Sequence, residues 1–107
     1  MTSLLSEPAE WRVAVIALDQ GCIMAGLSPT ECSDDVQAHH VITQQQLRHL
    51  GMADHVWDVE NGAALCETHH RRHHNRHEPI PWSILPARCR RFANDLGIAY
   101  LLGRYYT

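Results

Sequence analysis

The sequence contains no lysine, no long apolar run and no basic start followed by an apolar stretch. Its longest near-continuous apolar run, residues 13–18, falls well short of the roughly 20 residues that a membrane helix needs. Without a basic start and an apolar stretch, no signal peptide is expected. We therefore predict a protein with no membrane segment and a cytoplasmic location.

All nine basic residues are arginines, and their distribution along the chain is uneven. Residues 1–67 hold ten acidic residues against two arginines, a formal charge of −8, whereas residues 68–107 hold seven arginines against two acidic residues, a formal +5. The overall charge of −3 therefore hides a strongly basic C-terminal part. A basic face of this kind favours a polyanionic partner, although a solvated arginine face on a helix is the alternative.

The chain of 107 residues is long enough for one domain, and its 45% hydrophobic content argues against disorder. Local signals predict an α+β fold. The first expected element is a helix over 6–20, with Ser6 as its cap and Pro8 in its first turn. A loop over 22–34, a strand over 36–42 and a short helix over 43–50 capped by Thr43 follow. A tight turn at Asn61-Gly62 then leads into a strand over 63–65, a polar helix over 67–77 and a helical segment over 83–106. We see no domain boundary.

The four cysteines, Cys22, Cys32, Cys66 and Cys89, accompany nine histidines and no export signal. This combination favours reduced, metal-binding cysteines over disulfides. The nine residues between Cys22 and Cys32 make too wide a spacing for a DNA-reading C₂H₂ finger. The alternative is that the cysteines are small buried apolar groups. Cys89 lies in an arginine cluster and is expected to be a free thiol.

Six of the nine histidines gather in two places: His39 and His40 on a predicted strand, and His69, His70, His73 and His74 on the predicted helix after Cys66. Residues four apart share a helix face, and two such pairs occur on this helix, His69 with His73 and His70 with His74. A His-x3-His pair suits a transition metal that takes a further ligand from elsewhere. Two overlapping pairs weaken the alternative of incidental histidines on a solvated helix. The spacings also exclude the His-Glu-x-x-His metalloproteases and the zinc deaminases.

The order of these blocks resembles the HNH endonuclease family: Ala-His-His-Val-Ile at 38–42, Asn-Gly-Ala-Ala-Leu-Cys at 61–66, then His69-His70 and His74. The resemblance covers about residues 22–77, and small phage-encoded members are of similar size. It implies a ββα-metal core, in which two antiparallel strands and a helix hold one ion, with flanking α-helices and a single nuclease domain over 1–107.

The resemblance also implies roles for individual residues. His40 would be the general base, and Asn61 would orient His40, brace the turn or, as in several members, contact the metal. A catalytic Mn²⁺, Ni²⁺, Co²⁺, Zn²⁺ or Mg²⁺ would be held by His39, His70 and His74. Neighbouring strand residues point to opposite faces, so His39 and His40 can share a site only where the strand twists or ends.

Many HNH members add a structural zinc held by two Cys-x-x-Cys pairs, and this sequence departs from that pattern. Cys22, Cys32 and Cys66 lie near the core, and His69 stands where the fourth cysteine would be. We therefore predict a Cys₃His structural zinc, a chemically sound ligand set.

The implied activity is metal-dependent hydrolysis of DNA phosphodiester bonds. Arg71, Arg72 and Arg76 are expected to contact phosphates, and a second arginine cluster follows at Arg88, Arg90 and Arg91. The alternatives are a zinc-stabilised nucleic-acid-binding module without catalysis and a protein that stores or senses metal. A homodimer and a phage packaging partner remain open, and the implied location is the cytoplasm of a bacterial or phage-infected host cell.

Overall fold

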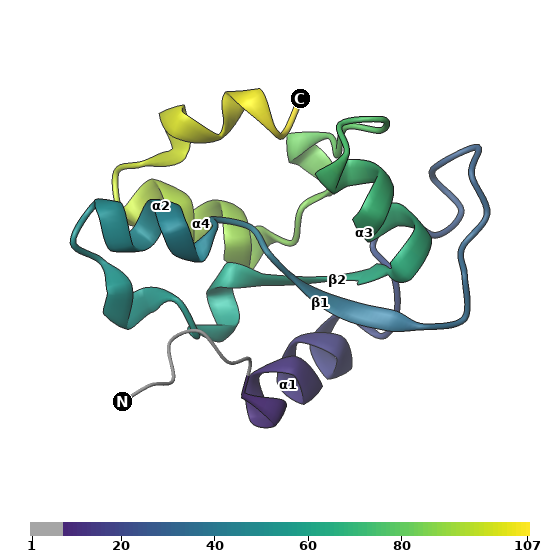
Figure 1. Ribbon diagram of the computed structural model, residues 1–107, viewed down its shortest axis with the longest axis horizontal. Helices are drawn as coiled ribbons and strands as arrows, with labels where there is room; N and C mark the ends of the chain where they lie inside the picture. The colour runs from purple at the N-terminus through teal and green to yellow at the C-terminus, as the bar shows by residue number, and fades with distance from the viewer. Residues whose placement is uncertain (1–7) are drawn as a thin grey trace.

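The computed structural model describes residues 8–107, which form an α+β fold of two strands and several helices (Figure 1). The elements are α1 Ala9–Asp19, β1 Val36–His40, α2 Gln44–His49, β2 Gly62–Cys66, α3 Glu67–His74 and α4 Ala87–Asp95, with 3₁₀ turns at Ala53–His55, Val59–Asn61, Trp82–Ile84 and Ala99–Arg104. The predicted α+β class is confirmed. Within residues 8–107, every helix is too short or too polar to cross a membrane.

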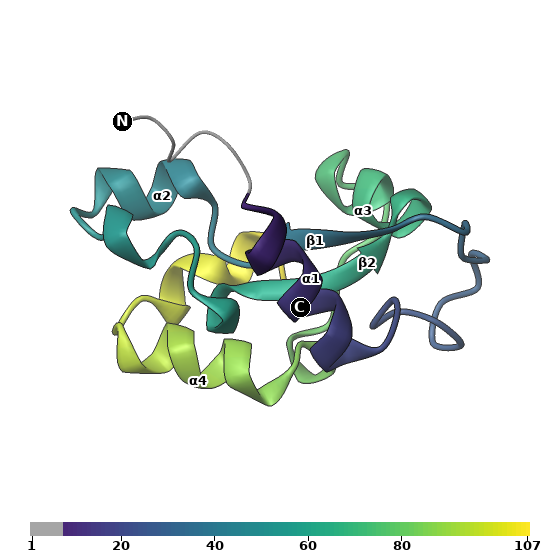
Figure 2. The same ribbon diagram turned by 90° about the horizontal axis from the view of Figure 1, so that it is seen from below.

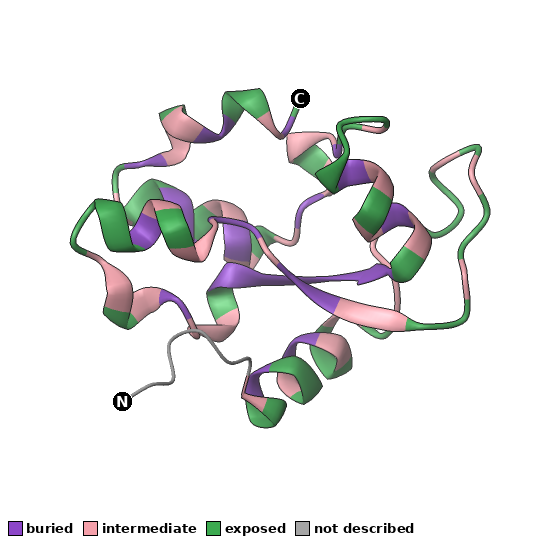
Figure 3. Cartoon of the chain, in the orientation of Figure 1, coloured by how far each residue is buried: buried purple, intermediate pink, exposed green. Residues whose placement is uncertain are grey.

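The two strands pair antiparallel, with His39 opposite Ala63 and His40 opposite Gly62. Every residue of β2 is buried, as Figure 3 shows, because β2 lies between α1 on one face of the sheet and α3 on the other (Figure 1 and Figure 2). The alternation of a strand sends successive β1 side chains to these two faces. Ala38 and His40 meet α1, whereas Gln37 and His39 meet α3.

Two apolar clusters hold these layers together. The smaller one, between α1 and the sheet, consists of Trp11, Val15, Ala38 and Ala64. The larger one joins α2, β2, α4 and the C-terminal 3₁₀ turn through fully buried aliphatic side chains such as Leu47, Leu65 and Leu102. The sheet therefore has a packed layer on each side, which fixes the direction of every β1 side chain.

Several predicted boundaries are corrected by the structure. The strand expected over 36–42 ends at His40, because the Asn61 side chain occupies both backbone groups of Ile42: Asn61 Oδ1 accepts from the Ile42 N–H at 2.8 Å, and Nδ2 donates to the Ile42 carbonyl at 2.9 Å. The helix expected over 67–77 ends at His74, and Arg76 adopts a left-handed φ of 60°. The segment over 83–106 divides into α4 and two 3₁₀ turns.

The starts of the N-terminal helix and of the short second helix can be compared with the capping residues predicted for them. The helix expected over 6–20 runs from Ala9 to Asp19, with Pro8 at its N-cap rather than in its first turn, and the predicted Ser6 cap lies outside the described residues. The Thr43 cap is confirmed, since its side chain and that of Gln46 form a reciprocal capping box.

The predicted tight turn at Asn61-Gly62 is wrong. Asn61 closes a 3₁₀ turn, and Gly62 begins β2 with an extended φ of −122°. Glycine is required here for space rather than for backbone freedom, because a Cβ on Gly62 would collide with the Val15 side chain and press on Trp11. The glycine thus allows α1 to approach the sheet closely.

Gly62→Ala is therefore expected to destabilise the fold by about 1–3 kcal/mol, the usual cost of overpacking a filled core. Gly103→Ala is the matched control, because a Cβ there meets no atom within 4 Å, and its effect should stay within about 0.5 kcal/mol. Urea unfolding of both variants measures the difference. Equal stability of the two would show that α1 does not pack on Gly62 as described.

Candidate metal centres

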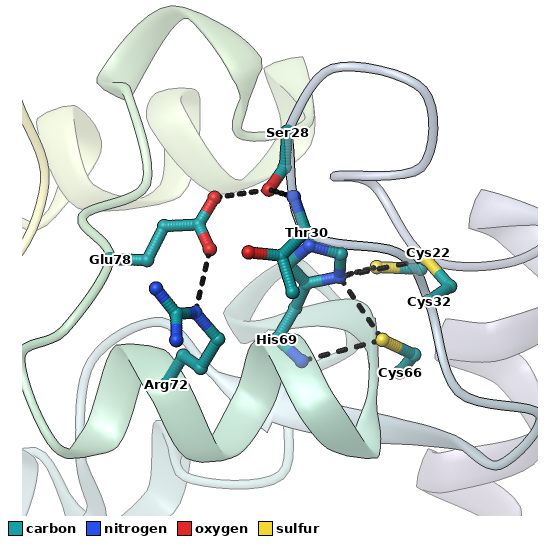
Figure 4. A network of polar contacts seen from close by, with 8 residues as sticks. All are labelled: Cys22, Ser28, Thr30, Cys32, Cys66, His69, Arg72 and Glu78. Carbon is teal, nitrogen blue, oxygen red and sulfur yellow. Dashed lines mark hydrogen bonds and ion pairs between the residues drawn. The ribbon is translucent and has the colours of Figure 1, made fainter.

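The first candidate metal centre joins the loop after α1 to the start of α3 (Figure 4). Cys22 and Cys32 come from the loop, Cys66 ends β2, and His69 lies in the first turn of α3. The three sulfur atoms lie 3.6, 3.5 and 3.1 Å from Nδ1 of His69, in that order. All four predicted zinc ligands therefore converge on one point.

These sulfur–nitrogen separations fit four ligands arranged tetrahedrally around one ion. Zinc bonds of about 2.3 Å to sulfur and about 2.0–2.1 Å to nitrogen place ligand atoms about 3.6 Å apart. All three cysteines are free thiols rather than disulfides. Burial raises the pKa of the Cys66 thiol, but hydrogen bonds from the backbone of His69 and Ser33 outweigh it and bring that pKa to about 6. The cluster is thus a candidate structural zinc site with one ligand already disposed to ionise.

A polar network beside this cluster fixes the cysteine loop. The Glu78 carboxylate accepts a hydrogen bond from the Ser28 hydroxyl and pairs with Nε of Arg72 at 3.0 Å (Figure 4). The contacts with Ser28 and Arg72 lower the pKa of Glu78 from its ordinary value. The loop that carries Cys22 and Cys32 is therefore tied to α3 and the segment after it by more than the cysteines.

The second candidate centre lies where α3 crosses β1. The side chains of His39, His70 and His74 each place one ring nitrogen within 4.8 Å of the ring nitrogens of the other two. The ring centroids of His70 and His74 are 4.8 Å apart, and those of His39 and His70 are 5.2 Å apart. Burial, helped by the neighbouring histidines, lowers the pKa of His39 well below its usual value and that of His70 to about 4. His39 and His70 are therefore neutral imidazoles, the form that binds metal.

Two of these histidines, His39 and His70, have a hydrogen-bond partner on one ring nitrogen. Nε2 of His39 lies 2.7 Å from the Tyr106 hydroxyl, and Nδ1 of His70 lies 2.7 Å from Oε1 of Gln37. The other nitrogen of the buried His39 ring, Nδ1, has no hydrogen-bond partner within residues 8–107. A buried nitrogen of this kind needs a ligand, and a metal ion is one that fits.

His40, the last residue of β1, lies on the opposite face of the strand. Its ring stacks on Trp11 with centroids 4.4 Å apart, and its Nε2 has no partner within the described part of the chain. Burial lowers its pKa to about 4, although a hydrogen bond to the Val56 backbone acts the other way. Because the strand ends here, His40 still lines the same hollow of about 520 Å³ as His39, His70 and His74.

Asn61 is fully buried and lies behind the site rather than in it. Besides its two bonds to the Ile42 backbone, its Nδ2 donates to the Val56 carbonyl at 3.5 Å. Val56 is also the backbone partner of the His40 ring. Asn61 thus braces the segment after β1 and the carbonyl that faces His40.

The three arginines expected to contact phosphate are in different surroundings. Arg71 is exposed on α3, Arg72 is paired with Glu78, and Arg76 lies over the Tyr105 ring at 5.7 Å. In the second arginine cluster, Arg88 binds the carboxylate of Asp19 at 2.8 and 2.9 Å. Arg71 is therefore the freest of the three on the metal-bearing helix.

Sequence reasoning missed several residues near the three histidines. The hollow is also lined by Thr43, Gln44, Gln45 and Arg48 around α2 and by Trp57. Thr43 carried a capping signal, but no local pattern indicates that α2 borders this hollow. His69 and His73, which share a helix face, do not share a metal centre: His69 joins the cysteines, and His73 stacks on Tyr106.

The first cluster predicts that protein purified without chelator holds one thiolate-bound zinc per chain, and that its removal unfolds the domain. Cys66→Ser should lose this ion, while Cys89→Ser should keep it, because Cys89 lies elsewhere and its sulfur faces the Gly62 carbonyl. Elemental analysis, and the sulfur-to-metal absorption of the cobalt-substituted protein, measure occupancy. Folded protein with no thiolate-bound metal would contradict the assignment.

Comparison of the chain with protein-family models, with curated proteins and with solved structures gives no match. The chemistry of the two clusters therefore has to carry any conclusion about function.

Proposed function

We propose that this chain is a zinc-stabilised, metal-dependent endonuclease of the HNH type that hydrolyses phosphodiester bonds in DNA. The observation that carries the proposal is the convergence of His39, His70 and His74, with His40 on the rim of the same hollow. The antiparallel β1–β2 pair followed directly by α3 agrees with the ββα order that the sequence resemblance implies.

The two clusters have different ligand chemistry, which supports two different tasks. Three cysteines and one histidine make a closed four-ligand set, typical of structural zinc. Three histidines leave coordination positions open for substrate and water, typical of a catalytic ion. When bound there, a divalent ion would supply Lewis-acid stabilisation of the charge that develops on the phosphate.

His40 is the residue that we propose takes a proton from the attacking water. With its pKa lowered to about 4 by burial, the imidazole is neutral at neutral pH and can accept a proton. The carbonyl of Val56 can only accept, so the ring nitrogen facing it carries the hydrogen, and Nε2, which has no partner within residues 8–107, keeps its lone pair. Stacking on Trp11 holds the ring in place.

The alternative, a zinc-stabilised module that binds nucleic acid without catalysis, needs the cysteine cluster but not the three-histidine cluster. Two ring nitrogens beside the hollow, Nδ1 of His39 and Nε2 of His40, are buried without a partner within residues 8–107, a cost that a binding module has no reason to bear. This cost favours the enzyme.

We expect substitutions to distinguish the proposed general base, His40, from the proposed metal ligands. His40→Ala, and His40→Phe which keeps a stacking ring on Trp11, should bind metal and DNA as the wild type does but cleave about 10²–10⁴-fold more slowly. His39→Ala, His70→Ala and His74→Ala should instead weaken metal binding and regain activity at high metal concentration. Because chelator would strip the structural zinc, the control is zinc-loaded protein without a second ion.

Titration of Mn²⁺ or Ni²⁺ against plasmid cleavage for all of these variants gives the answer. If excess metal rescues the His40 variants, or if they cleave at the wild-type rate, His40 is a ligand or a bystander and its role has to be reassigned.

We also propose that Arg71, Arg72 and Arg76 contact DNA phosphates. Replacing each by alanine should weaken binding about equally for all sequences and reduce the salt dependence by about one unit per lost contact. Arg71, which is exposed, should show the effect without loss of stability, whereas Arg72→Ala also breaks the pair with Glu78. Arg12→Ala is the control, since Arg12 is exposed on α1, on the other side of the sheet. Equal salt slopes for all four variants and the wild type, measured by fluorescence anisotropy, would rule out these contacts.

A further inference from the structure

The hydroxyl of Tyr106 links the C-terminal segment to His39. It donates to the Val41 carbonyl at 3.0 Å and lies 2.7 Å from Nε2 of His39. A carbonyl oxygen can only accept, so the single hydroxyl proton is already used there. The contact with His39 therefore has the ring as donor, which places the ring hydrogen on Nε2 and the lone pair on Nδ1.

Gln37 makes the same kind of contact with His70. Its Oε1 lies 2.7 Å from Nδ1 of His70, and its amide nitrogen donates to a carboxylate oxygen of Asp35 at 3.2 Å. The contact with Asp35 fixes which way the amide faces, because a carboxylate accepts hydrogen bonds. Gln37 therefore accepts from His70, whose ring hydrogen is on Nδ1 and whose lone pair is on Nε2.

We propose that Tyr106 and Gln37 are positioning residues that set the tautomer and ring direction of two ligands of the catalytic metal. This inference rests on the proposed function of the three-histidine cluster. A ligating histidine needs its second ring nitrogen held by an acceptor, and loss of that acceptor costs about 10–100-fold in metal affinity. Each histidine here uses a different nitrogen toward the metal, and the outer partner decides which one.

Both outer partners are themselves held by the fold. Tyr106 is 4% exposed, its ring stacks on His73 with centroids 5.2 Å apart, and its segment bridges to Ile80. Gln37 lies within β1, paired with Leu65 of β2. The C-terminal segment thus completes the metal site from outside the ββα elements that carry the ligands.

Tyr106→Phe and Gln37→Leu test the metal affinity. Each should lower the affinity of the second ion about 10–100-fold, measured by competition with a chromophoric chelator on protein that keeps its structural zinc. Gln37→Glu retains an acceptor for His70 and should keep near wild-type affinity. Tyr100→Phe makes the same chemical change at a 78% exposed position and should have no effect. Zinc content and thermal unfolding check that each variant is folded.

The tautomers themselves are read from long-range proton–nitrogen NMR correlations of protein loaded with structural zinc only. His39 should be protonated at Nε2 and His70 at Nδ1, and Tyr106→Phe should remove the preference at His39 alone. The opposite tautomer at either ring, or unchanged metal affinity in both variants, would overturn this inference and leave the endonuclease proposal standing. A wild-type chain whose histidines take up no second ion would overturn both.

Discussion

The short antiparallel pairing of β1 with β2 is the constraint on which both candidate metal centres depend. It sets Val36 opposite Cys66 and His39 opposite Ala63. The first pair fixes where α3 leaves the sheet, and the second sets His39 beneath that helix. Since a slip of one residue would turn every β1 side chain to the other face, the packing of Ala38 against α1 also determines that His39 faces α3.

The helix α3 serves the two centres from adjacent residues. Successive helical side chains are about 100° apart, so His69 and His70 point in different directions. His69 meets Cys66 and the cysteine loop, whereas His70 and His74 meet His39. An ion at the cysteine cluster would fix the first turn of α3, and with it the directions of His70 and His74. The candidate structural site and the proposed catalytic site are in this way linked through one turn of helix.

Part of this arrangement could be predicted from the sequence. The HNH resemblance implied the Cys₃His set and the three-histidine set, whose members lie together in the structure, and the local capping signal at Thr43 located α2. The prediction of a tight turn at Asn61-Gly62 was wrong because the glycine is needed there to leave space for the side chain of Val15, which is distant in sequence. Tyr106 and Gln37 could not be found for a similar reason: each acts through a tertiary contact with a histidine, and neither carries a pattern of its own. Tertiary packing decides what pattern alone does not.

The most direct measurement of the central claim is cleavage of supercoiled plasmid by the zinc-loaded chain as a second ion is added. Three imidazoles favour Mn²⁺, Ni²⁺, Co²⁺ or Zn²⁺ over Mg²⁺, which prefers oxygen ligands. The account predicts no cleavage without a second ion, and nicked or linear product at lower concentrations of those four ions than of Mg²⁺. Intact plasmid with every ion, under conditions where the protein binds it, would contradict the account and favour a binding module.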